Sequence, residues 1–164
     1  MPGVEAGTLK RTPLYAAHVE AGARLLLTSS FGANPLRLAG SSIAGRADEV
    51  CRVAVAVARR AAGTGTIVAG SLGPTGGVLA PYGPLDPGAV RAAYAQEAAV
   101  LAAAGVDVLW VETMMDLQEA VAAVDGAREA APEVPVVATL VFARGRTMFG
   151  DRPADAAATL AEHG

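Results

Sequence analysis

The chain has 164 residues, of which 52% are hydrophobic and 18% are charged, and its formal net charge at pH 7 is −3. This length allows one domain with a sizeable core. Without a basic patch or an acidic run, nucleic acid and anionic membranes are not expected partners, and no apolar stretch is long enough to span a bilayer. A single cysteine, Cys51, excludes an intramolecular disulfide, and no signal peptide is recognisable, so the sequence predicts a cytoplasmic protein.

Helical and strand patterns alternate along the chain. The expected helices cover 13–21, 47–62, 86–104, 116–131 and 153–163, and the expected short apolar strands cover 24–27, 66–69, 106–111 and 136–142. Asp86 before Pro87, and Asp116 with Glu119 three residues later, mark two helix starts, the second as a capping box. Strict alternation predicts an α/β fold with a parallel sheet. An open doubly wound sheet and part of a (β/α) barrel both remain open, and four strands indicate a section of a longer repeat.

Polar residues stand where the predicted strands end. Glu112 follows an almost purely apolar run, and Ser29, Ser71, Thr139 and, in a nearby loop, Asn34 hold comparable positions. Carboxyl ends of parallel strands meet at one edge, which is where (β/α) proteins bind ligands. One anion among neutral hydrogen-bonding groups suits a small ligand with an ammonium group. A loop carboxylate without a binding role would follow a strand in the same way.

Other conspicuous residues favour structural roles. The loop over 70–77 lacks the Lys-Ser/Thr ending of a phosphate-binding loop, and Pro74 removes one backbone donor. We expect this loop either to let its backbone approach a small ligand or to form a tight connection. Phosphate binding is the weaker alternative. Cys51 falls on an apolar helix stripe, and His18 has no partner at metal-ligand spacing. Glu119 is accounted for by helix capping.

Four stretches of the chain match motifs that occur together in one known family. Residues 28–34 (TSSFGAN) resemble TNTFGAN, and residues 69–76 (AGSLGPTG) resemble AGSIGPTG. Residues 105–120 (GVDVLWVETMMDLQEA) are similar to GVDLLLIETM.DL.EA, and residues 142–150 (FARGRTMFG) fit F...GRT..G. In these motifs, which keep their order over nearly the whole chain, the sequence resembles the homocysteine S-methyltransferase family. That family includes betaine–homocysteine methyltransferase and the N-terminal module of cobalamin-dependent methionine synthase.

The resemblance implies an eight-stranded (β/α)8 TIM barrel that binds homocysteine and zinc at its C-terminal face. Zinc would hold the homocysteine thiolate, which attacks the methyl group of a donor to give methionine. Glu112, in the ETM motif, would accept the substrate ammonium. Ser29, Ser71, Asn34 and Thr139 are the other candidate substrate-binding residues. The methyl donor stays unspecified, and a homocysteine-binding module of a cobalamin-dependent methionine synthase or a non-catalytic small-molecule-binding half-barrel remain as alternatives.

Departures from the family pattern predict a truncated barrel. The opening strand with its DG.MGT turn is missing, as are the later NC and GGCC motifs that carry the zinc cysteines, and Glu97 replaces a usual Gln. Residues 1–164 are therefore expected to form one partial domain, about strands 2 to 5, without a zinc ligand and inactive alone. Its open edges would pair with another copy or with a complementary barrel half.

Overall fold

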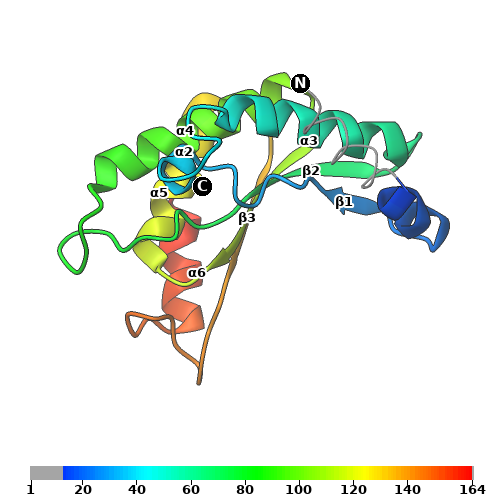
Figure 1. Ribbon diagram of the computed structural model, residues 1–164. Helices are drawn as coiled ribbons and strands as arrows, with labels where there is room; N and C mark the ends of the chain where they lie inside the picture. Colours follow the sequence, from blue (N-terminus) through cyan, green and yellow to red (C-terminus); the bar gives the residue numbers. More distant parts are fainter. Residues whose placement is uncertain (1–12, 164) are drawn as a thin grey trace.

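The computed structural model describes residues 13–163, which contain one four-stranded sheet. The strands are β1 (Leu25–Leu27), β2 (Ile67–Leu72), β3 (Val108–Met114) and β4 (Val136–Leu140), in that spatial order. Each strand pairs in parallel with its neighbour in the sequence. The predicted α/β fold with a parallel sheet is confirmed, and the chain folds as part of a (β/α) barrel (Figure 1).

Helices form the connections between the strands. A helix covers residues 13–20, and it is followed by α2 (Pro35–Leu38), α3 (Ala47–Ala62), α4 (Pro87–Ala103), α5 (Leu117–Ala130) and α6 (Pro153–Glu162). The start of α4 matches the prediction, because Pro87 occupies its first turn and the Asp86 carboxylate accepts a 2.8 Å hydrogen bond from the Ala89 N–H. Helices α3, α4 and α5 lie together along one side of the curved sheet (Figure 1).

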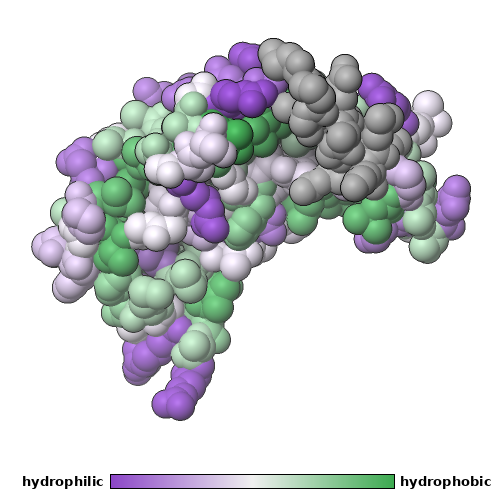
Figure 2. Space-filling model, in the orientation of Figure 1, coloured by the Kyte–Doolittle hydropathy of each residue, from purple (hydrophilic) through white to green (hydrophobic). Residues whose placement is uncertain are grey.

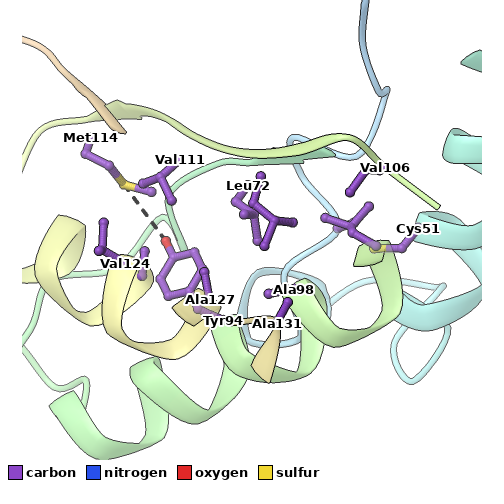
Figure 3. Close-up of a cluster of buried hydrophobic side chains, with 14 of the residues drawn as sticks. Cys51, Leu72, Tyr94, Ala98, Val106, Val111, Met114, Val124, Ala127 and Ala131 are labelled. Atoms are coloured by element: carbon purple, nitrogen blue, oxygen red, sulfur yellow. Dashed lines mark hydrogen bonds between the residues drawn. The ribbon is translucent and has the colours of Figure 1, made fainter. Parts of the chain in front are cut away.

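The core lies between these helices and the covered face of the sheet. Strand residues such as Leu72, Leu109 and Val111 are fully buried in it, and Figure 3 shows Leu72 and Val111 facing Tyr94 and Ala98 of α4. A small residue is needed where α4 and α5 cross. A Cβ added to Gly126 would lie only 2.6 Å from the Arg91 carbonyl oxygen, so the two helices approach at backbone distance.

The opposite face of the sheet is exposed only in part: Ala69 and Ser71 of β2 lie on it and are fully buried, whereas Ile67 is accessible. Side chains alternate between the faces of a strand, so Ile67 points away from the face to which Val68 contributes, and Ile67 is 45% exposed. All five residues of β4 are half-buried. Figure 2 shows hydrophobic residues among the atoms on the concave side of the arch. No helix of the described chain is long and apolar enough to cross a membrane.

Strand ends differ most from the sequence prediction. Both β2 and β3 continue three residues beyond the expected ends, so Ser71 and Glu112 lie inside strands rather than after them. β4 ends at Leu140, two residues early. The four-residue helix α2 was not expected, and it begins where the Asn34 side chain accepts a hydrogen bond from the Leu36 N–H. Thr12, the expected cap of the first helix, lies outside the described residues.

Candidate functional site

Ser71 and Glu112 meet near the carboxyl ends of two adjacent parallel strands, β2 and β3. The Ser71 hydroxyl donates a short hydrogen bond to Glu112 Oε1. Ser71 is fully buried and Glu112 is half-buried, so the carboxylate keeps access to solvent. A half-buried carboxylate with one oxygen fixed by a neutral donor can accept a charge-assisted hydrogen bond from a cation through the other.

Hydroxyl groups at the end of β1 hold Ser71 in place. The Ser71 N–H donates to Thr28 Oγ1 at 2.9 Å, and the Ser30 hydroxyl donates to the Ser71 carbonyl oxygen at 2.7 Å. Thr28 and Ser30 are themselves 2.7 Å apart through their hydroxyl oxygens, and both are buried. Since every group has a partner, the network fixes the strand that carries the donor to Glu112.

The β3–β4 ladder is irregular around Glu112. The register shifts between Val111 and Met114, and Thr113 has φ +63°. A β-branched residue rarely adopts this left-handed conformation. The Thr113 N–H donates to Thr139 Oγ1 at 3.3 Å, which ties the irregular segment to β4. The strain is local and lies next to the residue on which the site depends.

The remaining predicted site residues make hydrogen bonds to groups other than this pair. Ser29 is half-buried at the same end of the sheet, with its hydroxyl 3.0 Å from the Tyr15 hydroxyl. Thr139 acts on the site through Thr113. Asn34 is fully buried and directed elsewhere: its amide donates to Glu97 Oε2 at 3.2 Å while its oxygen caps α2.

Glu97 is a buried acid that sequence reasoning noted only as a departure from a motif. It is 2% exposed, and no described group reaches its Oε1. Burial raises the pKa of Glu97 to about 8, although the Asn34 amide works in the opposite direction. At neutral pH the carboxyl is therefore mostly protonated, and it belongs to the packing of α4 against α2 rather than to the Glu112 pair.

Glu119 makes tertiary contacts, which its position in a capping box did not predict. Its Oε1 accepts hydrogen bonds from the Thr75 N–H and hydroxyl, both at 2.7 Å, and from the Tyr94 hydroxyl at 3.0 Å. Asp116 does cap α5, by accepting from the Gln118 N–H, but the expected return bond of Glu119 is replaced by these tertiary contacts. Glu119 thus fixes the glycine-containing loop after β2 against α4 and α5.

Known proteins match the chain over nearly its whole length. A sequence model described as "Homocysteine S-methyltransferase" matches residues 12–164. The chain belongs to the homocysteine S-methyltransferase family. It is 32% identical over 159 residues to "Methionine synthase" of Mycobacterium tuberculosis, covering 91% of this chain and 13% of that protein. For "Methionine synthase" of Mycobacterium leprae the identity is 35% over 123 residues, covering 71% of this chain and 10% of that protein.

Solved structures support the fold. The metallated form of the homocysteine methyltransferase MmuM from Escherichia coli has a TM-score of 0.76 and 24% identity, over 93% of this chain and 58% of that one. The oxidized form of MmuM gives a TM-score of 0.81 and 23% identity, over 98% of this chain and 60% of that one. The homocysteine S-methyltransferase domain described here therefore spans less than two thirds of MmuM and a small share of the methionine synthases.

The described residues of this homocysteine S-methyltransferase family member do not fit the zinc that the family resemblance implies. Within residues 13–163 no three His, Cys, Asp or Glu side chains are grouped so that they could hold a metal ion. Cys51 is 1% exposed, and burial raises its thiol pKa to about 12, with the nearby Glu97 adding to the effect. A thiol in that setting stays protonated, whereas zinc binds the thiolate.

Proposed function

We propose that this chain binds the amino-acid end of L-homocysteine, with Glu112 as the acceptor of the substrate ammonium. The observation that carries the proposal is the Ser71–Glu112 hydrogen bond at the carboxyl ends of two parallel strands. This bond uses Oε1, and among the described residues no hydrogen bond to Glu112 Oε2 is found, so Oε2 can accept a ligand at the edge where (β/α) folds bind their ligands. Family membership supplies the substrate class, homocysteine, and the reaction class, methyl transfer to its sulfur to give methionine.

Of the other predicted site residues, some would contact the ligand in this proposal and others would act indirectly. Ser29 and Ser71 contribute hydroxyls close to the bound amino acid. Thr139 acts by holding the Thr113 backbone, and so the direction of Glu112. Asn34 acts at a distance, because it fixes the start of α2 and the loop before it. The described residues supply no group for the sulfur, so no step at the sulfur is derived for this chain.

A second candidate role is that of the homocysteine-binding module of a methionine synthase. The two mycobacterial relatives carry that name, and the 91% coverage of this chain by the first of them favours it. In that role the chain would work with further domains, and an assay with methylcobalamin would distinguish it. Because the described residues supply no group for the sulfur, the assay uses the chain together with such domains: methylation of homocysteine from methylcobalamin by the mixture would favour the module, and its absence would argue against it.

Cytoplasmic location is part of the same proposal. Cys51 is a free, buried cysteine, and the family substrate is itself a thiol. Both suit a reducing compartment.

Titration calorimetry with L-homocysteine tests the proposal. Glu112→Gln keeps the shape of the side chain but removes its charge, and we expect binding to weaken by about tenfold to a hundredfold, as for a lost hydrogen bond to a charged group. Glu133→Gln, at an exposed loop position, is the matched control and should bind as the wild type does. Equal affinities for wild type and Glu112→Gln would refute the assignment of the ammonium to Glu112.

A further inference from the structure

A cavity of about 340 Å³ lies among the loops near the ends of β2, β3 and β4, and neither Glu112 nor Ser71 lines it. Its wall combines Arg37 of α2, the glycines of the loop after β2, the acids Asp116 and Glu119 at the start of α5, and an apolar side. Its volume is at the small end of the range for small-molecule sites. Nothing in the proposed homocysteine site uses these residues.

Arg37 supplies a positive group that is already held in position. Its Nη1 donates to the Pro74 carbonyl oxygen at 3.0 Å, and its guanidinium carbon lies 5.7 Å from the centre of the Phe31 ring. Gly76 passes so close that a Cβ there would meet Arg37 Nη1 at 3.5 Å. A guanidinium anchored through one nitrogen and an aromatic face can offer its remaining N–H groups to a carboxylate at little entropic cost.

Two acids supply the negative side of the same cavity. Glu119 is 4% exposed, and its three hydrogen-bond donors all converge on Oε1. Asp116 accepts from the Gln118 N–H through Oδ1 and is half-buried. Burial raises the pKa of Asp116, and the neighbouring Glu119 and Asp151 carboxylates add to the effect.

Sulfur-containing and aromatic side chains form the apolar side. Met115, Met148 and Phe149 are 44%, 59% and 38% exposed, although all three are large and apolar. The Met148 N–H donates to the Met115 carbonyl oxygen at 2.9 Å, so the two methionines are held together. The flexible thioether of a methionine can adjust its shape to an unbranched apolar group of a ligand, which a branched protein side chain does less well.

We propose that this cavity is a second amino-acid site, which binds a zwitterionic α-amino acid with an unbranched apolar side chain. Arg37 takes the carboxylate, Asp116 and Glu119 take the ammonium, and the methionines with Phe149 cover the side chain. A simple anion would face two acids, a simple cation would face Arg37, and a nucleotide would exceed the volume. This site goes beyond the proposed homocysteine function and does not depend on it.

Methionine-methyl NMR with L-norleucine as the probe tests the site. The chain contains four methionines, of which Met114 is fully buried and serves as an internal reference. In the ¹³C-methyl-labelled chain we expect saturable shifts of the Met115 and Met148 methyl signals. Pentylamine and hexanoate, which each lack one charged group of norleucine, should bind about tenfold more weakly or worse.

Variants assign the binding to this cavity. Arg37→Gln should weaken norleucine binding about tenfold, whereas Arg60→Gln, at an exposed position of α3, should leave it unchanged. Glu112→Gln should also leave it unchanged, which separates this site from the homocysteine site. Absence of shifts at Met115 and Met148, equal affinity of Arg37→Gln and wild type, or loss of the shifts in Glu112→Gln would each overturn the proposal.

Discussion

The hydroxyl of Ser71 donates to the Glu112 carboxylate across the boundary between β2 and β3. One residue offers a buried hydroxyl, and the other a half-buried carboxyl group. The pair therefore joins a fixed donor to an acid that still reaches solvent. This arrangement makes the direction of the carboxylate, rather than its mere presence, the property that substitutions should change.

Removal of the Ser71 hydroxyl should weaken ligand binding without unfolding the chain. In Ser71→Ala the backbone bonds to Thr28 and Ser30 persist, but Glu112 loses its donor. We expect homocysteine affinity to fall about fivefold, equivalent to about 1 kcal/mol, as measured by calorimetry. Ser42→Ala, at an exposed position, should bind normally. Wild-type affinity in Ser71→Ala would show that the hydroxyl does not orient the acid.

Thr113 should show a conflict between stability and binding. Glycine tolerates φ +63° without the steric cost that threonine incurs, so Thr113→Gly is expected to raise the free energy of unfolding by about 1 kcal/mol. The same change loosens the segment next to Glu112 and should weaken homocysteine binding. Urea unfolding and calorimetry measure the two effects. Thr64→Gly, in an exposed loop without positive φ, should not stabilise the chain. A destabilised Thr113→Gly would contradict the strain argument.

Glu97 should make stability fall as the pH rises. Its pKa is about 8 in the folded chain and near 4.3 when unfolded, so between these values the folded state holds a proton that the unfolded state has lost. The free energy of unfolding then decreases by up to about 1.4 kcal/mol per pH unit. Glu97→Gln should flatten this dependence and be more stable than wild type at pH 8, measured by urea unfolding. Identical pH profiles for Glu97→Gln and wild type would exclude the effect, and Glu133→Gln should keep the wild-type profile.

The Tyr94 hydroxyl should matter for stability and the Tyr82 hydroxyl should not. Tyr94 is fully buried, and its hydroxyl lies 3.0 Å from both Glu119 Oε1 and the Gly73 carbonyl oxygen. Tyr94→Phe should lower the free energy of unfolding by about 1–3 kcal/mol, because a buried acceptor loses its donor. Tyr82 is 73% exposed, and Tyr82→Phe should change the free energy of unfolding by less than about 0.5 kcal/mol. Similar losses for both variants would argue against the Glu119 network.

The exposed part of the sheet face opposite the core should promote association of the purified chain. Ile67 is 45% exposed on the face opposite the core, and β4 has no strand beyond it among the described residues. We expect concentration-dependent oligomers by sedimentation velocity, and fewer of them in Ile67→Lys, since a charge opposes apolar contact between copies. Leu14→Lys, on the first helix, should associate as the wild type does. A monomer at all concentrations would remove the basis for this prediction.

Local signals predicted the helices well but not the limits of the strands. Asp86 with Pro87 fixes a helix start through contacts within four residues, and Gly105, at φ +92°, follows the end of α4 close to the predicted limit at 104. The end of β3 has no such signal, because it depends on a register shift against β4. A strand that pairs on both sides can continue past a charged residue, which is why Glu112 lies within it.

Tertiary contacts explain the differences within the candidate site. The convergence of Ser71 and Glu112 could be predicted, since parallel strands bring their carboxyl ends together. Glu119 looked like a capping residue because its actual partner, Thr75, is 44 positions away in the chain. Asn34 looked like a ligand contact for a similar reason: nothing in the sequence indicates that its amide reaches the buried Glu97.

The sequential strand order has a consequence for how the sheet opens. Every strand pairs only with its neighbours along the chain, and the Ser71–Glu112 pair lies on the central β2–β3 boundary. Fraying that begins at β1 or β4 must proceed through a whole strand before it reaches this boundary. Amide protons of β2 and β3 should thus exchange with deuterium last, so the proposed ammonium site would lie where the backbone opens least often.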